Sequence, residues 1–472
     1  MDNADTILDG LTTTYRPFAE RFLAIVPHSI AGMDVSQQTS VQFDAAGMPK
    51  QGTAVNQLAD AIQLACDRCR NDATVIDTAR SLWDQLLCGL PHYPIQDATA
   101  GDSTSFDEML RLGGAFRMLL GSLARPIYDA MVSHDSVHIP VEVVLQSFRG
   151  YAAMWLSTEL KWRVVVPLNL FRAEHDYELG PNLTIGPLQP DEKNDLAQRY
   201  WAPYKPFPLI DLASLSTMHG KFLWSITTPL DRGTRTQLLQ QVHEEWLATC
   251  RNALIALRLS RDGMVGFDRA YYVCTGPAIF PEYSAVWRED SFASTNYGTM
   301  YSLVDEDVER TRAQIKLVQK HESSKALNLA CDRFLQSYTQ LRPENRLIDL
   351  VVALESLLTD KDDLSYKFRL RGAALMRHKR SAQDTYALLQ DMYSARSQAV
   401  HDGLSWQEIT KKLPVKLNEC EDVCREAIGA VLEQYNDLVS GVSGKEKARL
   451  TQGLDRVILE LINSQSAADT VS

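Results

Sequence analysis

The sequence lacks the features of a membrane or secreted protein. No apolar run approaches the ~18–20 residues needed to span a bilayer, and no charged-then-apolar leader follows Met1. Positive charge is scarce, since 60 acidic side chains outnumber 48 basic ones and the net charge is −12. We therefore expect a cytoplasmic protein with no membrane partner, and this balance excludes a polycation that coats nucleic acid.

Common catalytic motifs are missing from the middle of the chain. Residues 161–300 contain no GxxxxGK[ST], GxGxxG or GxSxG, so they offer no nucleotide loop and no hydrolase elbow. The chain also lacks the clustered acids that a two-metal nuclease requires. We expect no cofactor, and any nucleic-acid contact must come from a local basic surface.

Eight cysteines raise the possibility of a metal site. Cys66 and Cys69 form a CxxC, and Cys420 lies four residues before Cys424. Both pairs fall on apolar helical stripes, where free cysteine packs as a small hydrophobe, whereas a zinc CxxC normally sits on a tight turn. A polar His/Asp/Glu segment at 134–142 is better explained as the start of a helix than as a ligand set. Core packing is favoured over metal binding at both places.

Hydrophobic periodicity predicts a mainly α protein. We expect a helical N-terminal region at 1–160, a small mixed α/β region at 161–304, a helical bundle at 305–462 and a disordered tail at 463–472. Strand-like stretches in the second region lie at 162–171, 177–186, 222–228 and 270–274, with a helix at 236–259. Helices in the third region are predicted at 325–338, 346–358, 364–378, 386–401 and 415–439.

The helix predicted at 386–401 carries an Arg and a His near its end. Its apolar residues at helical spacing define a buried stripe, formed by Tyr386, Leu389, Tyr393 and Val400. At about 100° per residue, Arg396 lies only about 40–60° from that stripe, so it must snorkel, pair with a carboxylate or face a cleft. His401 follows, just before a helix stop at Asp402-Gly403. A regular helix would place these two side chains about 140° apart, so they converge only if the helix bends or a second copy completes the site.

An Arg–His pair suits RNA cleavage. The reaction needs the 2′-hydroxyl deprotonated, the 5′-oxygen protonated and the charge on the phosphorane neutralised. Histidine exchanges protons near neutral pH, and arginine presents a permanently charged fork to two phosphate oxygens. One RxxxxH alone is a weak signal.

A local reversal of charge precedes this helix. Within fourteen residues the basic segment 367–380 holds six cations and no acid: Lys367, Arg369, Arg371, Arg377, Lys379 and Arg380. Taken alone, a solvated helix face balanced by the acids at 360–363 is the favoured interpretation. Beside Arg396 and His401, the segment becomes a candidate RNA-binding rim.

Three ordered motifs carry a family resemblance. Residues 346–358 (RLIDLVVALESLL), 364–374 (LSYKFRLRGAA) and 395–401 (ARSQAVH) resemble the "ALE", "LSYR…LR.A" and "LRS..VHG" helices of the Apea-like branch of the HEPN family. The resemblance covers about residues 320–440. It implies a bundle of about five helices, often dimeric and frequently a metal-independent ribonuclease of phage defence or toxin systems, in which the Arg and His of two protomers face each other.

Carried onto this chain, the catalytic residues of the family are Arg396 and His401. Glu355, of the "ALE" helix, either orients one of them or is an ordinary exposed carboxylate, and Ser397 and Tyr366 are weaker candidates for substrate contact. The chain departs from the family where Asp402 separates His401 from Gly403 and where Lys367 replaces an arginine. The inserted Asp402 would affect the charge of His401 or the helix cap.

The leading expectation is a HEPN-type endoribonuclease that forms a homodimer or higher oligomer. RNA, with tRNA as a candidate, would be its substrate, 2′,3′-cyclic phosphate its product, and the N-terminal 300 residues would sense a trigger or restrain the nuclease. The alternative is a HEPN fold kept as a catalytically inactive dimerisation or binding module. A third reading is a regulatory protein whose α/β region binds a small ligand.

Overall fold

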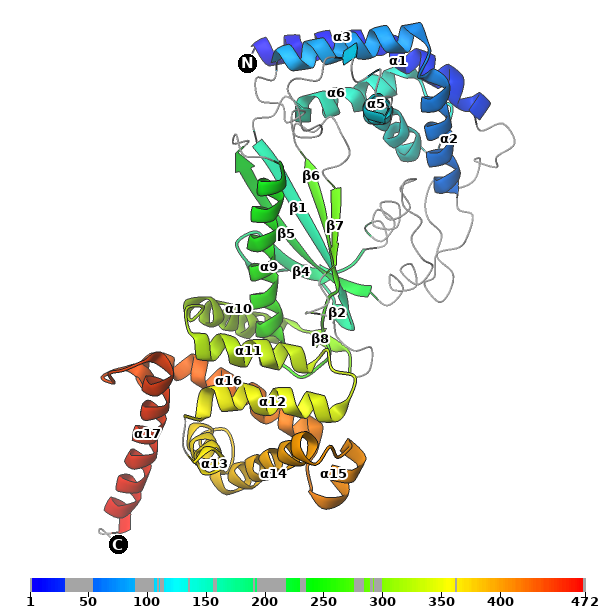
Figure 1. Cartoon of the computed structure of the whole chain (residues 1–472). Coiled ribbons are helices and arrows are strands. Elements are labelled where there is room, and N and C mark those ends of the chain that lie inside the picture. The colour runs from blue at the N-terminus through cyan, green and yellow to red at the C-terminus, as the bar shows by residue number, and fades with distance from the viewer. Residues whose placement is uncertain are drawn as a thin grey trace. The chain divides into compact units, whose positions relative to one another are not determined.

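The computed structural model describes residues 2–29, 54–89, 106–107, 110, 114–134, 136–155, 159–189, 192, 218–229, 235–275, 284–288, 292, 299–360 and 363–469. It confirms a mainly helical protein with a small sheet (Figure 1). No helix in these ranges is long and apolar enough to cross a membrane.

The chain divides into two compact units assembled from separate stretches. The first comprises Met1–Val166, Leu188–Trp246 and Ala270–Trp287, and the second comprises Pro167–Pro187, Leu247–Arg269 and Arg288–Ser472. The sequence instead predicts successive regions at 1–160, 161–304 and 305–462, and this division stays a prediction. Local periodicity cannot predict that the chain leaves a unit and later returns to it, because strand pairing joins residues that are far apart in the sequence.

The helices of the first unit pack around aromatic side chains. They are α1 (Asp2–Ser29), α2 (Ala54–Cys69), α3 (Ala73–Gly89), α5 (Gly114–Ser133) and α6 (Val141–Trp155). Tyr15 and Phe148 stack with ring centroids 3.7 Å apart, and the Tyr15 hydroxyl donates to the Leu123 carbonyl at 2.6 Å. Phe18 and Phe22 extend this core along the same face of α1.

Most of the sheet belongs to the first unit. Its strands lie in the order β5-β1-β6-β7, formed by Met218–Pro229, Glu159–Asn169, Arg269–Thr275 and Ser284–Arg288. β1 runs antiparallel to β6, with Lys161 opposite Thr275 and Val165 opposite Tyr271. The strand predictions at 162–171, 222–228 and 270–274 fall on β1, β5 and β6, because β-branched and aromatic runs suit a pleated surface.

The second unit begins with short strands. β3 (Tyr177–Gly180) and β4 (Leu183–Pro187) form an antiparallel hairpin within the strand-like stretch predicted at 177–186, and Asn182 in its turn adopts a φ of 64°. β2 (Phe171–Ala173) pairs in parallel with β8 (Tyr301–Leu303). The helix α9 (Arg235–Ser260) contributes its residues from Leu247 onward to this unit.

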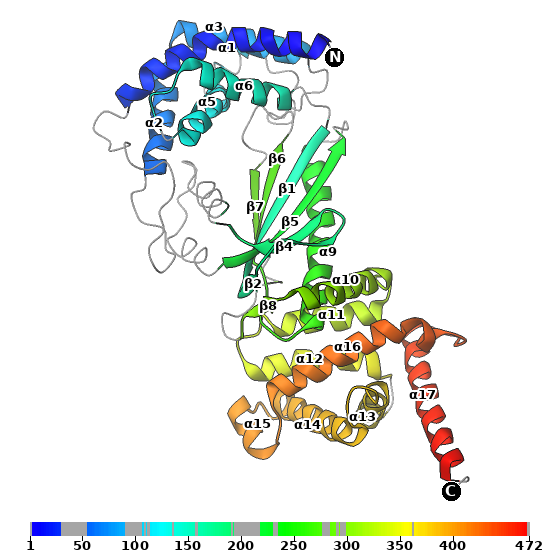
Figure 2. The same cartoon turned by 180° about the vertical axis from the view of Figure 1, so that it is seen from behind.

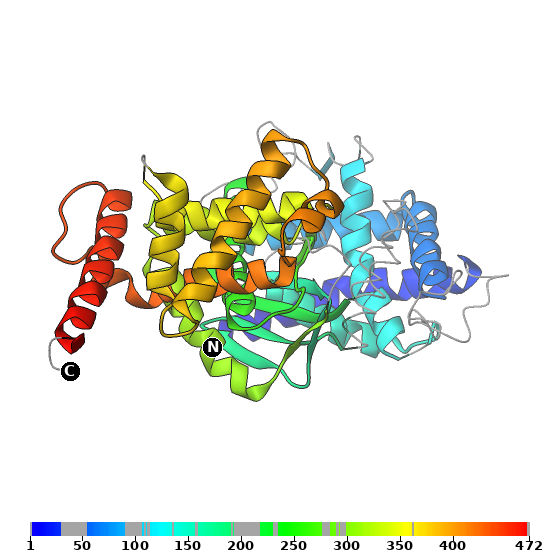
Figure 3. The same cartoon turned by 90° about the horizontal axis from the view of Figure 1, so that it is seen from below.

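Eight helices complete the second unit and form its bundle. They are α10 (Asp305–Lys320), α11 (Lys325–Ser337), α12 (Pro343–Leu358), α13 (Leu364–Leu375), α14 (Ala382–His401), α15 (Trp406–Lys412), α16 (Leu417–Val439) and α17 (Glu446–Asp469). α12 lies between α11 on one side and α13 and α14 on the other, and α16 packs across it (Figures 1 and 2). Figure 3 views the bundle from the side of α13 and α14, which run next to each other.

The hydrophobic periodicity did not predict the helices α15 and α17. The segment 463–469, predicted to be disordered, continues α17 as a helix. Leu450, Thr451 and Leu454 of α17 are buried, and at Gly453 a side chain would overlap the Leu438 carbonyl oxygen of α16. The two helices therefore cross in backbone contact, which only glycine permits.

Candidate functional site

The candidate site is built on α14. Ser381 caps the helix by accepting a hydrogen bond from the Asp384 amide at 3.4 Å. The face that packs inward is formed by Thr385, Leu389, Met392 and Ala395. This differs from the predicted stripe, because Tyr386 and Tyr393 are half-buried and Val400 is exposed. The periodicity was correct, but the buried face centres on Met392 and not on Tyr393.

Arg396 lies at the edge of this face and meets Glu355 of α12. Its Nη2 is 3.9 Å from Oε2 of Glu355, and the two side chains are 24% and 21% exposed. Within the described residues this long ion pair is not a hydrogen bond, and the Nε–H of Arg396 is shielded from solvent without a partner. Arg396 thus holds donors that no described residue uses, which is uncommon for a shielded guanidinium.

The Glu355 carboxyl lies in a mixed environment. Burial raises its pKa, and the charges of Arg396 and, more weakly, of Lys447 in α17 oppose that rise. Of the two interpretations of Glu355 left open by the sequence, its position beside Arg396 favours the orienting one. Ser397, the next residue along α14, is half-buried, and Tyr366 of α13 is 53% exposed.

His401 is the last residue of α14 and is exposed. The helix stays regular to its end, because the Asp402 amide donates to the Gln398 carbonyl at 3.1 Å, and Gly403 then turns the chain away with a φ of 66°. Asp402 is therefore the C-cap of an unbent helix. The spacing of five residues leaves Arg396 and His401 about 140° apart, and one copy of the chain does not bring them together.

The six cations of the basic segment 367–380 do not form a continuous RNA-binding rim. Arg371 is buried, and its guanidinium makes hydrogen bonds to both oxygens of Asp455 at 2.7 Å, to Asp360 and to the Leu358 carbonyl. This placement corrects its assignment as an RNA contact. A buried and fully paired arginine is a structural group.

The other five cations differ in whether a carboxylate neutralises them. Lys367, Lys379 and Arg380 form ion pairs with Asp360, Glu433 and Glu426, respectively. Among the described residues, Arg369 and Arg377 have no carboxylate partner, although Arg369 also packs 5.0 Å from the ring centroid of Tyr386. Local sequence could not show this pairing, because the Glu426 and Glu433 acids lie on another helix.

No metal site is found in the described part of the chain. His134 contacts the Ala130 carbonyl and Glu142 pairs with Arg16, while Asp135 lies outside the described residues. Cys66, Cys69, Cys420 and Cys424 are buried free thiols, as the core-packing interpretation predicts. Burial raises the pKa of Cys66 to about 12 and that of Cys69 to about 11, which suppresses the reactive thiolate.

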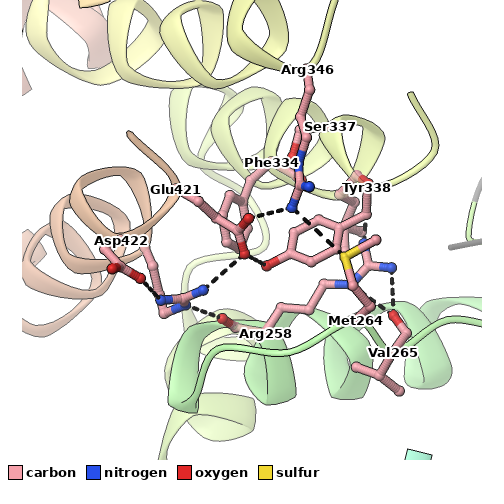
Figure 4. Close-up of polar contacts among 11 residues, drawn as sticks. Arg258, Met264, Val265, Phe334, Ser337, Tyr338, Arg346, Glu421 and Asp422 are labelled. Atoms are coloured by element: carbon pink, nitrogen blue, oxygen red, sulfur yellow. Dashed lines mark hydrogen bonds and ion pairs between the residues drawn. The ribbon is translucent and has the colours of Figure 1, made fainter. Parts of the chain in front are cut away.

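A buried polar network, which the sequence did not suggest, lies deeper in the same unit (Figure 4). The Glu421 carboxylate of α16 accepts hydrogen bonds from Tyr338, Arg346 and Arg425. Next to them, the Arg258 guanidinium of α9 lies 3.9 Å from the centroid of the Tyr338 ring and donates hydrogen bonds to the backbone carbonyls of Val265 and Leu335.

This network is structural. Burial lowers the pKa of Arg258 to about 10, so the group still carries its charge at neutral pH. The charge is stabilised by carbonyl dipoles and the ring face. The residues come from four helices and one loop, and hence no motif in the sequence could have predicted the cluster.

Comparison with known proteins adds no assignment. No protein-family model, no curated protein and no solved structure matches this chain.

Proposed function

We propose that the chain is a metal-independent endoribonuclease of the HEPN type, whose active site is completed between two copies. The observation that carries the proposal is Arg396: a partly buried guanidinium that meets, among the described residues, the Glu355 carboxylate alone and keeps donors without a partner. Such a group is ready to bind the two oxygens of a phosphodiester. The three motifs at 346–358, 364–374 and 395–401 support the same assignment.

The chemistry follows from the two residue types. His401 accepts the proton of the 2′-hydroxyl, whose oxygen attacks phosphorus, while the bond to the 5′-oxygen breaks and that oxygen takes up a proton from protonated His401. Arg396 neutralises the charge that develops on the phosphorane. The products are a 2′,3′-cyclic phosphate and a 5′-hydroxyl end, so the step needs no water and no oxidant. Glu355 holds Arg396 near its working position until the phosphate replaces it.

We propose that a second copy completes the site, and the geometry of α14 supports this. Because Arg396 and His401 point about 140° apart on a regular helix, the histidine that serves one arginine belongs to another copy. The neighbouring surface suits a homodimer, since Leu364, Tyr366 and Val400 are exposed apolar side chains on α13 and α14. We further propose that the first unit senses a trigger or restrains the nuclease, as in an anti-phage or toxin effector of the cytoplasm.

The direct test incubates the purified chain with total RNA and with tRNA. Arg396→Ala and His401→Ala should each lower cleavage about 10²–10⁴-fold. The matched controls are Arg342→Ala and His378→Ala, which remove an exposed arginine and an exposed histidine elsewhere in the bundle and should cleave normally. Equal cleavage by all five proteins, or products without cyclic phosphate ends, would contradict the assignment.

The second candidate function is a HEPN fold retained for dimerisation or binding. It is favoured by one observation: His401 is exposed at the end of a helix that stays regular up to its C-cap, Asp402. In that case His401→Ala changes neither RNA integrity nor toxicity in cells, whereas charged substitutions at Tyr366 and Val400 abolish oligomer formation.

A further inference from the structure

The helix α17 is fixed to the bundle at two polar points. Near its start, the Glu446 carboxylate accepts hydrogen bonds from the Lys325 amide at 3.1 Å, the Tyr435 hydroxyl at 3.1 Å and the Ser324 hydroxyl. Further along α17, the Asp455 carboxylate accepts hydrogen bonds from Nε and Nη2 of Arg371 in α13. Residues between these points are therefore set in one register against α12 and α13.

Lys447 lies between the two points, on the face of α17 that packs inward. It precedes the buried residues Thr451 and Leu454 by four and seven positions, the spacing of one helical face. The Lys447 side chain is nevertheless exposed, so the interface is open to solvent at this end. Within the described residues Lys447 has no ion pair within 4.0 Å.

Lys447 follows Glu446, which binds Ser324 and Lys325, and the carbonyl of the next residue, Ala326, accepts a hydrogen bond from Ser356 of α12, which follows Glu355. The start of α17 therefore lies beside the end of α12 that carries Glu355, and the charge of Lys447 opposes the rise in the pKa of that carboxyl.

Arg396 and Lys447 thus approach Glu355 from two helices, α14 and α17. A half-buried carboxylate flanked by two cations that it does not bind tightly is a place where an anionic ligand can displace it. Arginine supplies a planar fork, and lysine supplies a mobile point charge on a flexible stem. These are complementary ways to hold successive phosphates of one strand.

We propose that Lys447 is an RNA-binding residue of the site and contacts the phosphate next to the one held by Arg396. This inference rests on the proposed ribonuclease function and names a substrate contact for the same site. It also assigns a role to α17: the hydrogen bonds of Glu446 fix the start of this helix, so that the next residue, Lys447, lies near Glu355. Lys447 positions the strand and takes no part in proton transfer.

The test measures RNA binding without cleavage. The full chain carrying His401→Ala is titrated into a fluorescent RNA oligonucleotide at several salt concentrations, alone or with Lys447→Ala, Lys447→Arg or Lys445→Ala added. Lys445 is the matched control, because it is an exposed lysine two residues away that precedes α17. Loss of one phosphate contact should reduce the slope of log K against log salt by about 0.7.

We expect Lys447→Ala to weaken binding about tenfold and to lower that slope, while Lys447→Arg and Lys445→Ala keep both values. In the active chain, Lys447→Ala should raise KM more than it lowers kcat. Unchanged affinity and slope for Lys447→Ala, in a chain that binds RNA, would overturn this inference and leave the proposed function intact. Failure of the parent chain to bind or cleave any RNA would overturn both.

Discussion

The Arg396 guanidinium lies 3.9 Å from the Glu355 carboxylate without hydrogen bonding to it, whereas Arg371 grips both oxygens of Asp455 at 2.7 Å. Both pairs join helices of the same bundle. The difference in geometry separates a structural arginine, whose donors are satisfied, from one that retains binding capacity. The hydrogen bonding of each arginine therefore indicates its role better than its position in the sequence does.

Removing the Arg371 side chain should destabilise the protein. Arg371→Ala leaves Asp455 without its partner and opens a space in the interior, and we expect a loss of about 3 kcal/mol in the free energy of unfolding, at the low end for a buried pair because Asp455 is half-exposed. Arg369→Ala, on the same helix, should cost less than about 1 kcal/mol. Urea unfolding followed by circular dichroism measures both. Equal losses would show that the Arg371 pair has no special weight.

The raised pKa of Glu355 predicts a pH dependence of stability. The folded chain binds this proton more tightly than the unfolded chain does, so the stabilising contribution is present below the ordinary value of 4.5 and is lost as pH rises through the folded pKa. Glu355→Gln stays neutral and should therefore gain stability relative to wild type between pH 4 and pH 7. Thermal melts across this range test the sign, with the exposed Glu322→Gln as control. A loss of relative stability over the same range would show that the Arg396 pair outweighs burial.

Mixing two inactive variants should restore activity if the site forms between copies. In a heterodimer of Arg396→Ala and His401→Ala, one of the two sites keeps a wild-type arginine and a wild-type histidine. Random pairing then returns about a quarter of the wild-type sites. Co-refolding the two variants and measuring RNA cleavage gives the result. No recovery in a demonstrated heterodimer would place both residues in one copy.

The network around Glu421 should respond unequally to two conservative changes. Glu421→Gln removes the negative charge between Arg346 and Arg425, and we expect a cost of about 3 kcal/mol in the free energy of unfolding. Tyr338→Phe removes one hydroxyl and keeps the ring beneath Arg258, with an expected cost of about 1–2 kcal/mol. Proteolysis rates of the full chain rank the two variants. The reverse order would mean that the hydroxyl, and not the carboxylate charge, holds the cluster together.

Elements with strong periodicity were predictable from the sequence. The helix predicted at 346–358 is α12 (Pro343–Leu358), and the one at 386–401 is α14 (Ala382–His401), because apolar side chains recur along one face of each. The end of α17 was predicted to be disordered because the residues from Asn463 to Asp469, the last seven of its 24, are small and polar. Such composition favours disorder unless neighbouring turns continue into it.

Partners distant in sequence were not predictable. Arg371 and Asp455 are separated by 84 positions, and Arg425 reaches the Arg258 carbonyl over 167. Nothing local distinguishes Arg371, which is buried, from Arg369, which is not, although both lie in one basic segment. The position of Arg396 at the edge of a buried stripe was predicted, since that requires only the helical period. The roles of Arg396 and His401 stay predictions.

The backbone contact at Gly453 reverses an ordinary rule of helix propensity. Within a helix, replacing glycine by alanine normally stabilises by about 1 kcal/mol. Here the added methyl group would meet the Leu438 carbonyl oxygen, so the substitution that intrinsic propensity favours most is one that packing forbids. α17 therefore keeps glycine, a weak helix former, at position 453, where it crosses α16. Replacing this glycine by a residue with higher helix propensity would push the two helices apart.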